Sequence, residues 1–584
     1  MHQFFQRTGQ SAKKFFRLFG SVLRHFAPRT FFRHVKNLFG ILRQKGFRGL
    51  AAQVRNFNTN MRRENTAADP LVLTPGCRVG IIATRHTRFV AQLCAHQLTQ
   101  AGFCPQIFVD DEALPYEDIP YLIICPQFLR SFPKQYAVFQ MEQTVSSRWL
   151  TRDYIQILKN ANAVFDYSLV NVDYFRRYAD IAKKTYYLPI DFCPDLTRNT
   201  ESTAQKEYDV LFYGDVNDRR QAILDELSKE FRIRVVREVF GEPLYEQLRR
   251  ARLVLNLHYY EGALLETTRL YEVLSVSDAL IVSERSADPN EETRLEDIAD
   301  FCPVGDVAAL RERIGYWLSH ESERQEKAAQ NARLLRERAN AFSFYFDRFL
   351  LSQEAVGFDD FYKRNGAFIH FNGERVCLSL AETTGRRANF DRDNRFGFEV
   401  FPGLRHTTGW IGCALSYCFL MRKAAEQGLP RLIVCEDDTQ FPADFAQRLD
   451  RVLARLDRED DWDIFCGLVA NSDGIEVIGV EHDGAQRYIR LSRMMSMVCN
   501  VYSQSAYPYF AHWDPHAADE SVRTIDGFLA SQNLRILSVL PFLCGHKPEE
   551  ISTVWGGSNS DRYSDIIERS AAHLTLQADA FDAD

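Results

Sequence analysis

The stretch Arg431-Leu-Ile-Val-Cys-Glu-Asp-Asp438 joins a run of apolar residues directly to three consecutive carboxylates. A continuous apolar run is typical of a strand that is buried on both faces of a sheet. We therefore predict a strand over residues 431–435, with Glu436, Asp437 and Asp438 at its carboxyl end. Carboxylates in such a position can hold a divalent cation, which would neutralise the phosphate oxygens of a bound ligand.

The segments on either side of this strand continue an α/β pattern. Upstream, residues 375–380 form another apolar run, followed by a polar turn that contains Arg386 and Arg387. Gly409-Trp-Ile-Gly-Cys-Ala-Leu-Ser-Tyr417 then begins a predicted helix. Further short motifs follow downstream: Trp462-Asp-Ile-Phe465, Asn500-Val-Tyr-Ser503, Thr524-Ile-Asp526, Leu540-Pro541, Cys544 and Ser552.

Taken in this order, these motifs resemble those of glycosyltransferase family 25, which includes lipooligosaccharide β-galactosyltransferases and collagen galactosyltransferases. The resemblance extends over residues 365–575. It implies a GT-A domain and an inverting, metal-assisted transfer of a sugar from a nucleotide-sugar, commonly UDP-galactose.

The resemblance also implies roles for the acidic residues. Asp438 would be the primary ligand of Mn²⁺ or Mg²⁺, with Asp437 and Glu436 supporting it. Both ions prefer oxygen ligands, and the site offers no cysteine cluster that would favour zinc. Asp526 would contribute to the site, and we expect it to be the general base, because an inverting transfer needs a carboxylate to take the proton of the acceptor hydroxyl.

Three more residues of this region are candidates on the same basis. Arg386 and Arg387 would hold the nucleotide, since a guanidinium pairs well with phosphate oxygens. His546 could be a further metal ligand, although a lone histidine is more often structural. The chain departs from the family pattern at several positions, which leaves the sugar donor and acceptor open. An inactivated GT-A domain is the alternative. These departures are Trp410, Tyr417 and the segment Met497-Val-Cys-Asn500.

Residues 70–350 alternate short apolar runs with longer amphipathic ones, which predicts two doubly wound units with a polar break near residues 197–207. In such sheets, ligands bind at the carboxyl ends of the strands. The predicted strands are Val79–Ala83, Gln106–Val109, Tyr121–Cys125, Ala137–Phe139, Ala163–Phe165, Tyr208–Tyr213, Ile233–Val236, Leu253–Leu257 and Ala279–Val282.

This region resembles the GT-B glycosyltransferases, and the stretch from His258 to Glu272 is similar to their nucleotide-sugar signature. The resemblance implies that Glu272 binds the ribose hydroxyls and that Arg269 lies near the diphosphate. An alternative is that these two residues, three positions apart, form only a surface pair on a helix. A non-catalytic module is therefore also possible.

Other residues of the middle region are weaker candidates. Gly214, followed by Arg219 and Arg220 at a strand-to-helix turn, could cradle a phosphate, because helix N-termini present free N–H groups to anions. His258 is a candidate for the nucleotide site, and Glu142, at the end of a strand in the other unit, could face the acceptor.

The first 65 residues carry 14 Lys and Arg against a single acid, Glu64. Apolar residues recur there at helical spacing between the cations, as in amphipathic helices that lie on a bilayer surface. We predict that this segment binds an anionic membrane surface. A helical hairpin packed on the first domain is the alternative, and nucleic-acid binding is disfavoured because no recognised motif accompanies the charge.

The 584 residues have 46% hydrophobic and 26% charged residues, which is ordinary globular composition and allows several cores. The 13 cysteines form no C-x-x-C pair, which favours a reducing cytosol, and no apolar run is long enough for a membrane span. The localisation expected is cytoplasmic, at the inner face of the cytoplasmic membrane.

The sequence therefore predicts an α/β chain with a basic helical segment (1–65), two Rossmann-like units of a GT-B module (70–195 and 206–350) and a GT-A domain (365–575). The expected function is a bifunctional glycosyltransferase that extends a bacterial surface glycan or glycolipid. The alternatives are a single active GT-A enzyme with an acceptor-binding module and a non-enzymatic glycan-binding scaffold.

Overall fold

The computed structural model describes residues 67–110, 113–145, 149–197, 205–484, 486–552, 559 and 563–583. The basic segment 1–65 predicted to bind a membrane lies outside the described residues. Among those that are described, no helix is both long and apolar enough to pass through a bilayer. The chain divides into two compact units, Met1–Glu337 and Arg338–Asp584.

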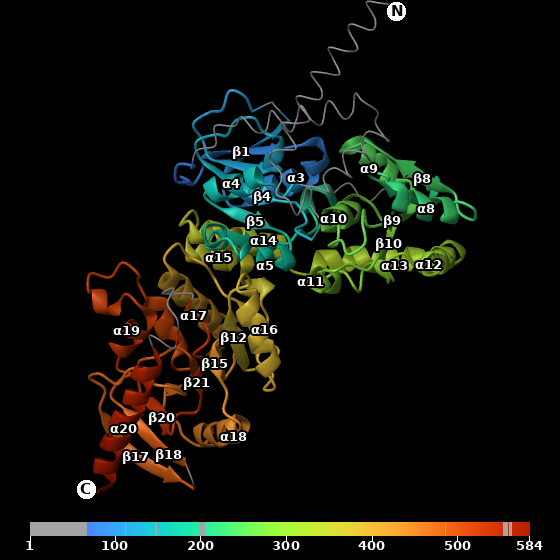
Figure 1. The fold of residues 1–584 in the computed structure, drawn as a ribbon. Coiled ribbons are helices and arrows are strands. Elements are labelled where there is room, and N and C mark those ends of the chain that lie inside the picture. The colour runs from blue at the N-terminus through green and yellow to red at the C-terminus, as the bar shows by residue number, and fades with distance from the viewer. Residues whose placement is uncertain are drawn as a thin grey trace, which may run out of the picture. The chain divides into compact units, whose positions relative to one another are not determined.

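The first unit contains a six-stranded sheet with the strand order β2-β1-β3-β4-β5-β6, shown in blue to cyan in Figure 1. Every neighbouring pair in it is parallel. Its strands are β1 (Arg78–Ala83), β2 (Cys104–Val109), β3 (Tyr121–Ile124), β4 (Tyr136–Gln140), β5 (Val164–Asp166) and β6 (Thr185–Tyr187). The helices of this part are α3 (Arg88–Gln100), α4 (Arg152–Asn160), α5 (Leu169–Phe175), α6 (Ala179–Ala182) and α7 (Pro194–Thr197).

A second parallel sheet of five strands follows in the same unit, with the order β11-β10-β9-β7-β8. Its strands are β7 (Tyr208–Tyr213), β8 (Ile233–Val236), β9 (Ala251–Asn256), β10 (Leu280–Glu284) and β11 (Asp300–Cys302). The helices are α8 (Asp218–Leu227), α9 (Glu242–Arg249), α10 (Thr267–Val276), α11 (Pro289–Thr293), α12 (Val307–Ser319) and α13 (Glu321–Glu337). Both sheets are Rossmann-like, which confirms the α/β prediction for this region.

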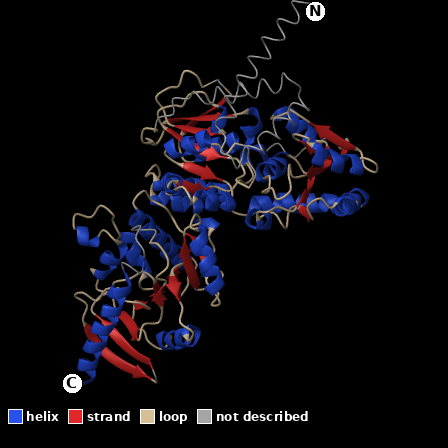
Figure 2. Ribbon diagram, in the orientation of Figure 1, coloured by secondary structure: helices blue, strands red, loops and turns tan. Residues whose placement is uncertain are grey.

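The second unit contains a mixed sheet of eight strands with the order β13-β12-β14-β19-β16-β20-β18-β17, and a small sheet of β15 and β21. Figure 2 shows helices alongside the strands of this unit. The strands are β12 (Arg375–Ser379), β13 (Glu399–Pro402), β14 (Arg431–Glu436), β15 (Thr439–Gln440), β16 (Ile464–Cys466), β17 (Val477–Asp483), β18 (Gln486–Leu491), β19 (Cys499–Ser503), β20 (Ile536–Leu540) and β21 (Gly545–His546). The helices are α14 (Ala341–Ser352), α15 (Phe358–Asn365), α16 (Thr384–Asp393), α17 (Gly409–Glu426), α18 (Phe445–Leu456), α19 (Ile525–Ala530) and α20 (Asp565–Ala583).

Helix α14 belongs to this second unit, whereas the sequence analysis placed residues up to 350 with the preceding one. The contacts of its buried Arg348 explain why α14 groups with the second unit. The guanidinium donates to both carboxylate oxygens of Glu382, at 2.7 and 3.0 Å, and to the Gly403 carbonyl oxygen at 2.7 Å. A buried arginine needs such partners, because an unpaired charge in the interior is costly.

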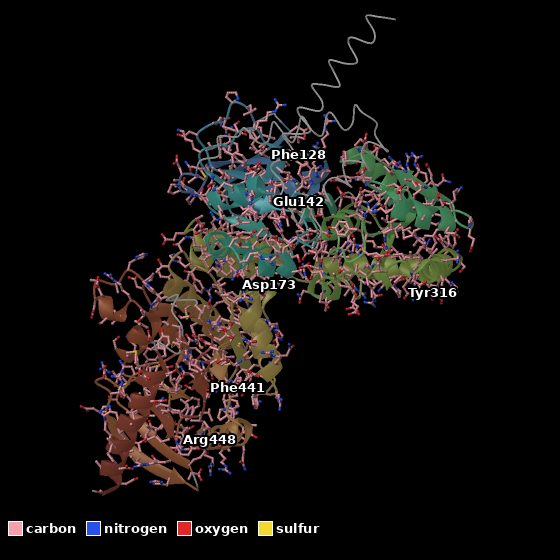
Figure 3. The ribbon with its side chains drawn as sticks, in the orientation of Figure 1. Phe128, Glu142, Asp173, Tyr316, Phe441 and Arg448 are labelled. Carbon is pink, nitrogen blue, oxygen red and sulfur yellow. The ribbon has the colours of Figure 1, made fainter. Side chains whose placement is uncertain are left out.

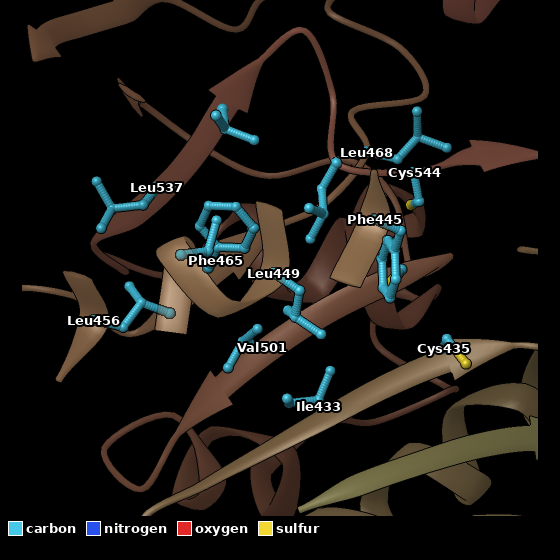
Figure 4. Packing of buried hydrophobic residues seen from close by; sticks show 14 of the residues in the cluster. Ile433, Cys435, Phe445, Leu449, Leu456, Phe465, Leu468, Val501, Leu537 and Cys544 are labelled. Carbon is cyan, nitrogen blue, oxygen red and sulfur yellow. The ribbon is translucent and has the colours of Figure 1, made fainter. Parts of the chain in front are cut away.

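The core of the second unit lies between α18 and the strands that lead to the acidic turn (Figure 4). Leu449 of α18 is 1% exposed and packs in one cluster with Ile433 of β14 and Val501 of β19. Burying a side chain of this size stabilises the fold by roughly 1.5–3 kcal/mol. This packing fixes β14, and hence the position at which Glu436 leaves the sheet.

Candidate functional site

The acidic end of β14 opens into a pocket of the second unit. Glu436 is the last residue of β14, as the sequence predicts, and Asp437 and Asp438 follow it directly. The pocket is lined by residues that come from several separate segments of the chain. They are Trp410, Cys413, Glu436, Asp438, Ala470, Ser496, Met497, Val498, Thr524, Ile525, Asp526, His546, Ser552, Asn559, Tyr563 and Ile567.

Asp437 is not among the described residues that line this pocket, and two neighbouring side chains hold its carboxylate. Its Oδ2 accepts a hydrogen bond of 2.8 Å from Ser379 Oγ, and its Oδ1 is ion-paired with Arg386. Arg386 also lies 3.0 Å from Asp438 Oδ2. Burial alone would lower the pKa of Arg386, but the charges of Asp438 and Asp437 raise it above its usual value. Arg386 is therefore a fixed cation beneath the acidic turn.

Asp438 is buried, and its two carboxylate oxygens differ in their contacts with the described residues. Its Oδ2 accepts from Asn559 Nδ2 at 3.1 Å and lies 3.3 Å from His546 Nε2. Its Oδ1 has no hydrogen-bond partner among the described residues. Burial would raise the pKa of Asp438, but His546 and Arg386 lower it, so that the carboxylate is ionised.

The pKa of Glu436 is shifted in the direction opposite to that of Asp438. Burial, and then the negative charge of Asp438, raise its pKa well above its usual value. The thiol of Cys413 lies 3.9 Å from Glu436 Oε1. Two carboxylates with opposed shifts in one pocket are typical of functional sites, because their arrangement favours a bound cation or proton between them.

His546 reaches this pocket through strand pairing. The two-stranded sheet sets His546 of β21 opposite Thr439 of β15, one residue beyond Asp438. The backbone N–H of Lys547 adds a 2.8 Å bond to the carbonyl oxygen of Asp438. The pairing explains how a residue more than a hundred positions away joins the acidic turn.

Asp526 lies in the first turn of α19 and lines the same pocket. Thr524 caps this helix, its hydroxyl accepting from Gly527 N at 3.3 Å. The structure thus brings together Asp526 and three of the predicted metal ligands: Glu436, Asp438 and His546. It places Arg387 elsewhere, since its Nε donates to the exposed carboxylate of Asp391, at 2.8 and 2.9 Å.

Whether this pocket suits a metal ion depends on the side-chain atoms that could bind it. Among the described residues, no group of three or more His, Cys, Asp or Glu side chains is arranged to hold a metal. Asp438 Oδ1, buried and without a hydrogen-bond partner in the part of the chain that the structure describes, is nevertheless an oxygen donor of the kind that Mn²⁺ and Mg²⁺ prefer. The donor chemistry suits these ions, and metal dependence remains a prediction.

Sequence reasoning did not single out Asn559 as a site residue. Asn559 is fully buried, donates to Asp438 Oδ2 and also to the Lys547 carbonyl oxygen, at 3.2 Å. No motif in the chain marks it, because it lies in a polar stretch with no periodicity. Only the folded chain shows that it supports the acidic turn.

In the first unit, Gly214 lies at the end of β7 with a φ of +118°, a conformation that favours glycine. A Cβ at this position would be 2.9 Å from Arg269 Nη2, so the glycine allows the arginine to approach the turn. Arg269 Nη1 donates to Asn256 Oδ1 at 2.8 Å. The structure therefore places Gly214 and Arg269 side by side at the carboxyl ends of β7 and β9.

Arg219 and Arg220 hold neighbouring loops. Arg219 pairs with both carboxylate oxygens of Glu284 and donates to the His258 carbonyl oxygen at 2.9 Å. Arg220 is buried and donates to the carbonyl oxygen of Leu257 at 2.6 and 3.0 Å. Burial lowers the pKa of Arg220 to about 9. Both arginines thus already have several protein partners.

The remaining candidates of the nucleotide signature also have protein partners. His258 Nδ1 lies 2.8 Å from Glu266 Oε2, and its Nε2 lies 2.7 Å from the Arg285 carbonyl oxygen. Glu272 accepts a 3.0 Å bond from the hydroxyl of Tyr213, and burial raises its pKa to about 7. Their roles toward a nucleotide remain predictions.

Glu142, labelled in Figure 3, follows the end of β4 in the first sheet. Gln127 Nε2 donates to its Oε1 at 2.8 Å. The next residue, Gln143, exchanges hydrogen bonds of 2.9 Å with the backbone of Leu264, from the loop before α10. Glu142 therefore lies where the carboxyl ends of the two sheets of this unit approach each other.

Two segments of the chain match the models of known protein families. Residues 197–343 match the model described as glycosyl transferase-like. Residues 402–465 match glycosyltransferase family 25 (LPS biosynthesis protein), a range that includes the acidic end of β14. The chain is similar to glycosyltransferases in both segments. The sequence-based resemblance to a family 25 domain preceded by a GT-B-like domain is thereby confirmed.

Curated relatives match part of the chain. The inactive glycosyltransferase 25 family member 3 of Homo sapiens is 28% identical over 127 residues, 19% of this chain and 21% of the relative. Procollagen galactosyltransferase 1 of Danio rerio is 26% identical over 102 residues, 16% of this chain and 17% of the relative. The chain spans about a fifth of the length of these relatives.

Solved structures show more distant likeness. An α-glucosyltransferase in complex with UDP and a 13-mer DNA containing an HMU base has a TM-score of 0.36 and 12% identity, covering 47% of this chain and 98% of that one. Sucrose-phosphate synthase from Thermosynechococcus elongatus has a TM-score of 0.34 and 13% identity, covering 48% of this chain and 100% of that one. Likeness at this level carries no argument about substrates.

Proposed function

We propose that the second unit is a GT-A type galactosyltransferase that uses UDP-galactose. The observation that carries this proposal is the convergence of Glu436, Asp438, Asp526 and His546 on one pocket. The match of residues 402–465 to family 25 supports it, because that segment contains the acidic end of β14.

In this reaction the acceptor hydroxyl oxygen attacks the anomeric carbon of galactose, and the bond between that carbon and the diphosphate oxygen breaks. The bonding electron pair leaves with UDP, and the hydroxyl proton passes to the Asp526 carboxylate. A single displacement of this kind inverts the anomeric configuration. Asp526 suits the role because it shares the pocket with Asp438 while lying on a different element, α19.

Asp438, whose Oδ1 is buried and has no hydrogen-bond partner among the described residues, would hold Mn²⁺ or Mg²⁺. Glu436 and His546 line the same pocket and would have to move toward the ion to join it, because the described residues form no group of three metal ligands. When bound, the ion supplies positive charge that neutralises the departing diphosphate. Arg386, ion-paired with Asp437 and Asp438, keeps the acidic turn in place from the opposite side.

We further propose that the first unit carries a second, metal-independent transfer site. Arg269, beside Gly214, would contact the diphosphate, and Glu272 the ribose. Glu142, on the other sheet of the unit, would face the acceptor. No equivalent of the Glu436–Asp438 turn ends a strand in residues 208–284, which is the basis for metal independence.

The proposed acceptor is a bacterial surface glycan or glycolipid such as lipooligosaccharide or capsule, and the basis is the resemblance to family 25. Residues 1–65 would hold the enzyme at the inner face of the cytoplasmic membrane. Two sites on one chain would raise the effective concentration of the first product at the second site. A single active unit or a glycan-binding scaffold are the alternatives.

The first test measures sugar transfer by the full chain across a panel of nucleotide-sugars, with and without Mn²⁺, for the wild type and D438N. We expect Mn²⁺-dependent turnover of UDP-galactose that falls by about 10²–10³-fold in D438N, because stabilisation of the developing diphosphate charge is lost. D391N is the matched control, since Asp391 is an exposed carboxylate outside the pocket. Equal activity of D438N and wild type with UDP-galactose would refute the proposal.

A further inference from the structure

Trp410 forms part of the pocket wall in the second unit. It is the second residue of α17, and its side chain is half-buried. Its indole N–H makes no hydrogen bond with the described residues, and its ring lines the pocket together with Asp526 and Glu436. The wall therefore offers an aromatic face and a donor to whatever occupies the pocket.

A second tryptophan supports this ring. Trp513 packs edge-to-face against Trp410, with ring centroids 6.5 Å apart and planes at 89°. The Trp513 Nε1–H donates to the Arg523 carbonyl oxygen at 2.8 Å, and Arg523 Nε donates to the Ala517 carbonyl oxygen at 2.8 Å. Arg523 precedes Asp526 by three residues. Trp410 is thus braced by the segment that leads into Asp526, the proposed general base.

The charges of the pocket restrict the kind of ligand. Three carboxylates line it, from Glu436, Asp438 and Asp526, against one imidazole, that of His546. An anionic group next to Asp526 would be repelled, because like charges in a partly buried site disfavour each other. Arg386 and Asp437 are not among the described residues that line the pocket with Trp410. Trp410 is linked through Trp513 and Arg523 to the segment that leads into Asp526, which favours the side of the pocket where the acceptor hydroxyl would lie.

We propose that Trp410 is the stacking platform for the terminal sugar ring of the acceptor, and that this ring is a neutral pyranose. A pyranose presents an apolar face of C–H groups that packs on an aromatic ring, while its hydroxyls remain free to bond polar groups. With the ring on Trp410, one hydroxyl faces Asp526. This inference rests on the proposed transfer function, and it names the class of acceptor.

The test uses the full chain and the variants W410A and W410F. The probes are methyl β-galactoside, methyl β-glucoside and glucuronic acid, with binding followed by calorimetry, and UDP binding is measured in parallel. We expect a neutral glycoside to bind the wild type about tenfold more tightly than W410A, a loss of about 1.4 kcal/mol, with W410F intermediate. Glucuronic acid should bind more weakly than the neutral glycosides.

In transfer assays with UDP-galactose, W410A should raise the KM for the neutral acceptor rather than the KM for the donor. L576A, an exposed position on α20, is the control for surface substitution. Equal glycoside affinity in the wild type, W410F and W410A would overturn the inference, as would a loss of UDP affinity in W410A, which would assign the ring to the nucleotide base. Failure of the wild type to bind any glycoside would also overturn it.

The two proposals fail differently. If the wild type neither binds UDP nor transfers galactose, the transfer function is wrong. Glycoside binding that still depends on Trp410 would then identify a sugar-binding pocket without catalysis.

Discussion

Asp526 is positioned by the residue that follows it. A Cβ on Gly527 would lie 2.1 Å from the Ser521 carbonyl oxygen, so the turn at the start of α19 closes only around glycine. The Asp526 Oδ1 accepts a 3.0 Å bond from the same Gly527 N–H. One glycine thus determines both where the helix begins and where the carboxylate of the proposed general base lies.

Glu272 leads to a prediction about pH. Its pKa is raised to about 7 by burial, compared with 4.5 for an ordinary glutamate, so the folded protein holds a proton that the unfolded chain releases. The contribution of this group to stability is therefore largest below pH 4.5 and is lost as the pH rises to about 7, by on the order of 3 kcal/mol. E272Q, which mimics the protonated form, should match the wild type at pH 5 and exceed it at pH 8.

Differential scanning calorimetry of both proteins at the two pH values measures this difference. E226Q is the control, because Glu226 lies on α8 with 47% of its side chain exposed. A difference in melting temperature between E272Q and the wild type that is the same at pH 5 and pH 8 would contradict the assignment.

Single residues of the site were predictable to different degrees. Asp438 and Asp526 were candidates because they lie in a recognised order of motifs, and His546 was a weaker candidate. The structure places all three on one pocket. Arg387 was expected beside Arg386 but lies on the exposed face of α16, since neighbouring helical residues point in different directions. Asn559 was not predictable because its role depends on a contact with Asp438 that no local pattern encodes.

The pairing of strands explains how residues far apart in the sequence meet in the pocket. Residues 431–435 were predicted as a strand from their apolar run, and β14 extends one residue further, to Glu436. The pairing of β15 with β21 could not be predicted, because each strand has only two residues. The short strands β6 and β11 were also missed, since Thr185-Tyr-Tyr187 and Asp300-Phe-Cys302 lack the aliphatic run that marks a buried strand.

Helix α18 gives a prediction about stability. L449A removes a side chain that is 1% exposed in the cluster beneath β14, and it should lower the free energy of unfolding of the second unit by about 2–5 kcal/mol. Urea denaturation of the full chain measures this change. I478A, at a position that is 57% exposed on β17, should change stability by less than about 0.5 kcal/mol. Equal effects of the two substitutions would show that the α18 core does not support the sheet as described.

The chain contains two compact units, and each has a segment similar to glycosyltransferases. The parallel sheets of the first unit were predictable from their continuous apolar runs, which are required when both faces of a sheet are covered. The antiparallel part of the second unit was not predicted, because its edge strand β17 has no buried residue and ends in the polar stretch Glu481-His-Asp483. Where a unit ends depends on long-range contacts such as that of Arg348 with Glu382, which the local sequence does not reveal.

A reciprocal comparison of D438N and R269A tests most directly whether the chain carries two separate sites of sugar transfer. Both variants are made in the full chain, and both sugar transfers are measured in the same assay. We predict that D438N loses the Mn²⁺-dependent transfer and keeps the metal-independent one, and that R269A, which removes the guanidinium beside Gly214, does the opposite. Loss of both transfers in either variant, or of neither in both, would contradict the claim that this chain carries two separate sites of sugar transfer.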